Sequence, residues 1–206
     1  MSTSSRVLAA LLCALAPLEV ARAGEVSGHV ALAVEGASLE GAGPVVVYLE
    51  GIDAPLVSTL HRRALEIHQK DASFSPVFLA IAAGEAVVMP NDDLIFHNVF
   101  SYSTPNDFDL GLYPRGESRT KTFQYPGVVR IYCSIHESMN ATIFVSPSSL
   151  FAVAGPGGAF SIRDVPPGKY RLRTWNRRLP PASQVVDVGV GAPAVAELVV
   201  AADASR

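Results

Sequence analysis

The chain has 206 residues, of which 16 are basic and 19 acidic, and its formal net charge at pH 7 is −3. This mildly acidic balance, without a long run of either charge, argues against a protein that binds nucleic acid. The length allows one large domain or two small ones, each with a real core.

The N-terminal segment predicts export. Arg6 precedes an apolar run from Val7 to Leu18, and the small residues of Ala21-Arg22-Ala23 match the pattern that signal peptidase recognises. We therefore expect a signal peptide over residues 1–23 and a periplasmic mature chain. The apolar run is about half as long as a bilayer requires, and no later run reaches ~18 apolar residues, so we expect no membrane span.

After cleavage the chain would keep a single thiol. Of the two cysteines, Cys13 lies inside the predicted signal peptide and Cys133 remains. In an oxidising compartment an unpaired thiol is buried and inert, paired with another chain, or bound to a metal.

Nearly every later segment has the pattern of a strand. Alternating or β-branched apolar runs are separated by Gly, Pro, Asn and Asp about every ten residues, as in an antiparallel sandwich or barrel. Only residues 57–67 have helical character. The predicted fold class is therefore all-β. In chain order, we expect strands within residues 25–35, 44–51, 78–93 (two strands), 94–102, 119–125, 127–133, 141–146, 158–165, 168–175, 184–190 and 196–201.

The two ends of the chain share a pattern that the middle lacks. Both ends combine Gly-led strands with Gly-rich turns, and Pro166-Pro167-Gly168 predicts a hairpin between residues 157 and 176. These ends resemble the first and last parts of a carboxypeptidase-regulatory-like (transthyretin-like) β-sandwich. The resemblance implies that residues 24–63 and 148–206 form one sandwich, and that residues 64–147 are a second β domain inserted in it or packed on it.

Chemically distinctive residues gather in one loop of this middle segment. Cys133, His136 and Met139 stand three residues apart between two predicted strands, so their side chains can turn toward one point. Thiolate, imidazole and thioether form a soft ligand set that favours copper. A second histidine would complete a site of two histidines, a cysteine and a weak axial methionine, and His97 is the best candidate. Each residue taken alone also fits a buried core position.

The segments VVMPNDDLIFHNVFS, YPGVVRIYCSIHESM and ATIFV resemble the cupredoxin (blue, type 1 copper) family across residues 64–147. The spacing of the ligand loop is similar to the short loop of amicyanin. The resemblance implies a Greek-key sandwich with one type 1 copper held by His97, Cys133, His136 and Met139. It also implies that Asn98 hydrogen-bonds to the ligand loop, that a backbone N–H approaches Cys133, and that His136 is the exposed edge for electrons.

The predicted function is the carriage of single electrons between redox partners, such as a cytochrome or a dehydrogenase, without enzymatic chemistry. We expect Phe96, Val99, Ile131 and Ile135 to form the apolar shell of the metal. Further copper sites of an oxidase are not expected, since none of the five histidines forms a His-x-His pair, and no Gly-x-Ser-x-Gly motif suggests a hydrolase. His29, His61 and His68 are interpreted as surface or strand residues. Two alternatives stay open: a periplasmic copper carrier or storage protein, and a metal-free interaction module.

Overall fold

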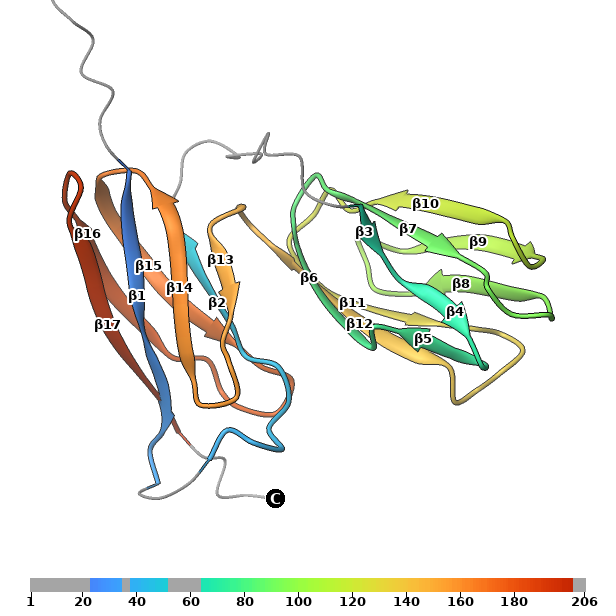
Figure 1. Ribbon diagram of the computed structural model, residues 1–206, viewed down its shortest axis with the longest axis horizontal. Coiled ribbons are helices and arrows are strands. Elements are labelled where there is room, and N and C mark those ends of the chain that lie inside the picture. Colours follow the sequence, from blue (N-terminus) through green and yellow to red (C-terminus); the bar gives the residue numbers. More distant parts are fainter. Residues whose placement is uncertain (1–22, 35–37, 52–63, 202–206) are drawn as a thin grey trace, which may run out of the picture.

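The structure is a computed structural model that describes residues 23–34, 38–51 and 64–201. Nearly all of the predicted signal peptide, and also His61, lie outside the described residues. Within them every regular element is a strand, so the predicted all-β class is confirmed (Figure 1). The segment with helical character is described only from residue 64, where Leu65 and Glu66 form a short strand because they pair with Val87 and Val88.

The first two strands and the last five form two facing sheets (Figure 1). They are β1 (Gly24–Leu32), β2 (Val46–Glu50), β13 (Phe151–Val153), β14 (Ala159–Val165), β15 (Gly168–Trp175), β16 (Ser183–Val188) and β17 (Pro193–Val200). One sheet has the order β14-β1-β17 and the other the order β13-β2-β15-β16. Apolar side chains that alternate along these strands fill the space between the sheets, among them Val30, Leu49, Ile162, Leu172 and Leu198.

The predicted hairpin at Pro166-Pro167-Gly168 is wrong. β14 and β15 do flank this turn, but β14 pairs with β1 in one sheet and β15 pairs with β2 and β16 in the other. The chain therefore crosses from one sheet to the other, and the Tyr170 hydroxyl fastens the crossing by donating to the Pro166 carbonyl at 2.9 Å. Rigid prolines and a permissive glycine suit either connection, because they specify a sharp turn but not which strands pair.

The strands between these two groups form a second set of sheets, drawn from teal to gold in Figure 1. One sheet has the order β6-β12-β11-β8-β9, a second has the order β10-β7-β3, and β4 and β5 form a hairpin. Their bounds are β3 (Leu65–Glu66), β4 (His68–Lys70), β5 (Ser73–Ser75), β6 (Phe78–Ala82), β7 (Ala86–Pro90), β8 (His97–Ser101), β9 (Phe108–Tyr113), β10 (Ser118–Thr122), β11 (Gly127–Tyr132) and β12 (Asn140–Ser146). A separate core lies between them, with Ile67, Met89, Phe123, Ile131 and Ile143 fully buried.

A cluster of aromatic side chains joins the two sets of sheets. Phe144 of β12 lies against Trp175 of β15, with ring centroids 4.8 Å apart, and against Tyr48 of β2 at 5.4 Å. Phe78 of β6 stacks on Trp175 at 5.8 Å. Aromatic rings of this size bury large apolar areas, so the cluster fastens the two halves to each other. Trp175 is thus a half-buried residue of this junction.

Candidate metal centre

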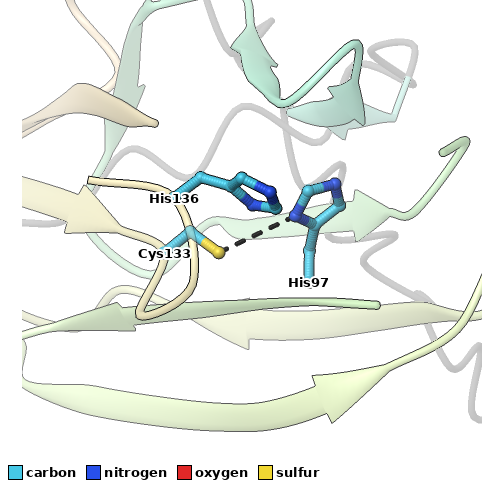
Figure 2. Close-up of side chains that lie close together, drawn as sticks. All are labelled: His97, Cys133 and His136. Atoms are coloured by element: carbon cyan, nitrogen blue, oxygen red, sulfur yellow. Dashed lines mark hydrogen bonds between the residues drawn. The ribbon is translucent and has the colours of Figure 1, made fainter. Parts of the chain in front are cut away.

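The strand order brings together two segments that are distant in the sequence. His97 is the first residue of β8, and Cys133 follows directly after β11. These strands are neighbours in one sheet, with Phe100 opposite Tyr132. The loop from β11 to β12, which also contains Met139, then brings Cys133 and His136 close to His97 (Figure 2).

Three of the four predicted ligand side chains converge. One ligand atom each from His97, Cys133 and His136 lies within 4.8 Å of the other two. The His97 Nδ1 atom is 3.7 Å from the Cys133 Sγ atom, and the two imidazole rings have centroids 4.9 Å apart (Figure 2). His97 is fully buried, Cys133 is 5% exposed, and His136 is half-buried. The cluster therefore lies at the edge of the core, and the His136 imidazole is the part of it that reaches the solvent.

One nitrogen of this cluster lacks a hydrogen-bond partner. The His136 Nδ1 atom is buried and has no partner among the described residues. Leaving a buried polar atom unsatisfied costs about 1–3 kcal/mol, so such an atom in a native fold calls for an explanation. A cation bound between His136 and the other two donors would satisfy this nitrogen.

The surroundings of Cys133 favour its thiolate form. Burial raises the pKa of the thiol, but the backbone N–H groups of Asn98, Ile135 and His136 and the imidazole of His97 outweigh burial and lower the pKa to about 6. Thiolate is the form that binds metals.

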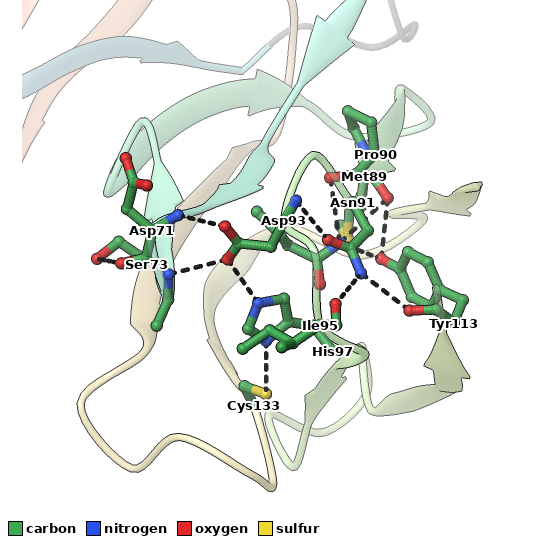
Figure 3. A network of polar contacts seen from close by, with 12 residues as sticks. Asp71, Ser73, Met89, Pro90, Asn91, Asp93, Ile95, His97, Tyr113 and Cys133 are labelled. Atoms are coloured by element: carbon green, nitrogen blue, oxygen red, sulfur yellow. Dashed lines mark hydrogen bonds and ion pairs between the residues drawn. The ribbon is translucent and has the colours of Figure 1, made fainter. Parts of the chain in front are cut away.

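The orientation of His97 is fixed from its far side by Asp93. The His97 Nε2 atom lies 2.7 Å from Asp93 Oδ2, so Nε2 donates to the carboxylate and Nδ1 is the nitrogen that faces the sulfur (Figure 3). Asp93 also accepts the backbone N–H groups of Asp71 at 2.7 Å and Ala72 at 2.9 Å. Burial raises the pKa of Asp93, and these three hydrogen bonds together lower it below its ordinary value. This carboxylate holds the imidazole in the tautomer that a metal requires.

Asn91 shapes the turn that presents Asp93. Its amide donates to the carbonyls of Ile95 and Tyr113, both at 2.9 Å, and its Oδ1 atom accepts the Asp93 N–H at 2.9 Å (Figure 3). The role of Asp93 was not predicted. The only signal in the sequence is a carboxylate four residues before the histidine, and that spacing acquires meaning only once the turn is known.

The ligand loop is closed by hydrogen bonds at both of its ends. The Asn98 Oδ1 atom accepts the backbone N–H of Ser134 at 2.8 Å and its hydroxyl at 2.9 Å, which confirms the predicted role of Asn98. The Cys133 N–H donates to the Met139 carbonyl at 3.2 Å, and the Met139 N–H donates to the His136 carbonyl at 2.9 Å.

Met139 is 1% exposed and packs in the same core as Cys133. Its backbone is tied directly to the cysteine, which places the residue beside the cluster. Its part as the fourth ligand stays a prediction.

The predicted apolar shell is only half right. Val99 and Ile131 are fully buried, but Phe96 is 55% exposed and Ile135 is 50% exposed. Phe96 lies just before β8 and continues an exposed apolar run with Leu94 and Ile95. Phe96 and Ile135 each neighbour a predicted ligand in the sequence, and both lie at the surface.

The other predicted surface histidines behave differently from one another. His29 is exposed on β1. His68, on β4, lies 2.6 Å from Asp92 and 3.0 Å from Glu66. None of the described residues belongs to a helix that could cross a bilayer.

Comparisons with known proteins return cupredoxins, the family that the sequence motifs resemble. Over 40% of this chain and 99% of the other, the structure is similar to a novel purple cupredoxin from Nitrosopumilus maritimus, with 26% identity and a TM-score of 0.36. Over 48% of this chain it is similar to a Cu(I) structure of an amicyanin mutant (14% identity, 97% of that chain, TM-score 0.39) and to a reduced Cu(I) form of another amicyanin mutant at pH 4 (16%, 97%, 0.39).

No family model matches the sequence, and no curated protein matches it. The structural likeness spans less than half of this chain at TM-scores below 0.5, so the metal chemistry is argued from the residues themselves. The resemblance of the outer strands to a transthyretin-like sandwich stays a prediction.

Proposed function

We propose that this protein is a periplasmic type 1 copper protein that carries single electrons between redox partners. His97, Cys133, His136 and Met139 would hold one copper ion within a domain of residues 64–147. Residues 24–63 and 148–206 would form the sandwich that carries this domain, after removal of a signal peptide at residues 1–23.

The observation that supports the proposal most strongly is the assembled donor set. Two imidazoles and a thiol already lie within 4.8 Å of one another. One of these imidazole nitrogens is buried without a partner, and the sulfur is held in a setting that lowers its pKa to about 6. Nitrogen and sulfur donors in this combination suit copper and do not suit magnesium, calcium or manganese.

Each residue has a distinct part in the proposed function. A bound copper ion would supply reversible one-electron chemistry. Asp93 and the backbone donors to Cys133 hold two ligands in place, so few atoms need to move when the charge of the site changes. The half-buried His136 offers the path to the surface. The exposed Phe96 and Ile135 beside it suit short-lived contact with a protein partner.

The alternative of copper carriage is less well supported. Carriers present exposed methionine or histidine clusters, whereas Met89 is fully buried and Met139 is 1% exposed. The described residues contain one cluster of potential metal ligands, the one built around Cys133.

The test is to add Cu(II) to the mature chain and record its visible spectrum. We expect an intense thiolate-to-copper band that ascorbate bleaches, that Cys133→Ser abolishes, and that His136→Gln weakens or shifts. His29→Gln, which changes an exposed histidine on β1, is the matched control and should leave the band intact. A colourless protein that retains only Cu(I) would favour carriage, and a protein that binds no copper would contradict the proposal.

A further inference from the structure

A cavity of about 430 Å³ opens between the two sets of sheets. From the outer sandwich, it is lined by the loop of residues 41–44 together with Trp175, Arg177 and Arg178. From the middle strands, it is lined by Phe78 and by residues of the segment 138–142. Its size falls within the range of sites for small organic molecules, about 300–1,000 Å³. It belongs to neither half alone.

The lining of this cavity is positively charged although the chain as a whole is negative. Arg177 and Arg178 both line the cavity, and none of the described residues that line it is acidic. A second hollow of about 440 Å³ shares Thr142, Trp175 and Arg177 with the first and adds Arg130. In a chain of net charge −3, a cleft with three arginines and no carboxylate in its described lining is complementary to an anion.

The turn that carries both arginines is held in place without a ligand. Arg178 donates from Nη1 to the Gly41 carbonyl at 2.9 Å. Arg177 has no ion-pair partner in the part of the chain that the structure describes, so its guanidinium is available. Both sit on a turn held by Asn176, which donates to the carbonyls of Ala42 at 3.1 Å and Pro44 at 2.9 Å.

Asn176 also fixes the far end of this turn. Its Oδ1 atom accepts the Arg178 N–H at 2.7 Å, and the side chain is buried. A rim held in this way pays little ordering entropy when it binds, which favours affinity.

The remaining lining determines the kind of anion. Phe78 and Trp175 offer aromatic edges to an apolar body, while Ser138, Asn140 and Thr142 add short polar groups. A guanidinium matches a carboxylate through two parallel hydrogen bonds. We infer that this cleft binds a small aromatic carboxylate, with its ring against Phe78 and Trp175 and its charged group on Arg177 and Arg178.

This inference does not depend on the bound metal. Even so, the cleft adjoins the ligand loop, because Ser138 and Asn140 stand on either side of Met139. A molecule held there touches both the outer sandwich and the loop that carries the predicted ligands.

Trp175 provides a direct test, since it is the only tryptophan of the chain. We would titrate the full chain, metal-free and after copper addition, with para-nitrobenzoate, whose nitro group quenches indole fluorescence. Neutral para-nitrobenzamide has the same shape and is the charge control. Arg177→Gln keeps the length of the side chain and removes its charge, and Arg171→Gln, an exposed arginine of β15 outside the cleft, is the matched control.

We expect quenching by the carboxylate to saturate at one molecule per chain and to weaken when salt is added. Arg177→Gln and Arg178→Gln should each weaken binding by about tenfold, the usual loss for a charge-assisted hydrogen bond, and Arg171→Gln should not. Quenching that never saturates, or that is equal for the carboxylate and the amide, would overturn the inference. So would unchanged binding by Arg177→Gln, since circular dichroism can check that this exposed substitution leaves the fold intact.

Discussion

Asp93 offers the sharpest test of how the proposed metal centre is held. Its carboxylate is 14% exposed and accepts hydrogen bonds from His97 and from the backbone of Asp71 and Ala72. Replacing it with alanine removes all three. A hydrogen bond to a charged group is worth about 1.5–3 kcal/mol, but the two backbone donors lie near the surface and can recover water. We therefore expect Asp93→Ala to lower the free energy of unfolding of the metal-free chain by about 2–3 kcal/mol.

Asp93→Asn separates the charge of this side chain from its shape. The asparagine has nearly the same shape, but it is neutral and has one acceptor oxygen in place of two, so it holds the Nε2 proton of His97 less strongly and cannot accept all three hydrogen bonds. We expect Asp93→Asn to lower the free energy of unfolding by about half as much as Asp93→Ala does. We also expect its copper affinity to fall by about 10–100-fold, the usual effect of altering a partner of a ligating histidine.

Urea unfolding of the metal-free chain measures the first effect, and competition with a chelator of known affinity measures the second. Asp92→Asn is the control, because its carboxylate contacts His68 and not His97. If Asp93→Ala binds copper as tightly as the wild type, the hydrogen bond at 2.7 Å does not orient the ligand and the argument fails.

Three further changes test other parts of the molecule. The hydrogen bond to Asp92 is the main cause that raises the pKa of His68 above 6.5, so the wild type should lose a small, salt-sensitive stabilisation as pH rises through the raised pKa. His68→Gln should lack this loss, which urea midpoints at several pH values would reveal. Gly28→Ala would place a Cβ atom 1.8 Å from the Ala196 carbonyl oxygen and should cost about 3 kcal/mol in thermal or urea unfolding, whereas Gly157→Ala meets nothing within 4 Å and should be neutral. Met139→Leu keeps the volume of a buried residue and should retain the visible band of the copper-loaded protein. Voltammetry should find a higher reduction potential, because a sulfur donor that stabilises Cu(II) is gone. An unchanged potential would remove Met139 from the ligand set.

The gathering of His97, Cys133 and His136 could be predicted because it depends on residue types and their order. Cys133, His136 and Met139 share a short loop, and the strand pattern on either side limits where that loop can point. His97 was predicted from chemistry that needed one more nitrogen. Asp93 escaped prediction because its contact with His97 depends on a turn that Asn91 fixes through two carbonyls.

The pairing of strands was harder to predict than their existence. β9 was missed: at Gly111, whose φ is 66°, the inward face of the strand shifts from Phe108 and Leu110 to Tyr113, so the apolar pattern in the sequence does not match the buried face. The turn between β14 and β15 was predicted as a hairpin since local residues do not show which sheet a strand joins. Register and sheet membership are decided by contacts between distant segments, such as β1 with β17, which no local pattern contains.

The way the ligand loop is closed bears on whether copper would be kept or handed over. A carrier has to open its site to release the ion, while an electron carrier works best when its ligands stay where they are. Here the loop is tied to β8 through Asn98 and Ser134, and tied to itself between Cys133 and Met139. His97 is held from behind by a carboxylate that is itself anchored to two backbone groups. Opening such a site would break several hydrogen bonds at once, which supports the proposed electron transfer, with the metal retained, over the alternative of copper carriage.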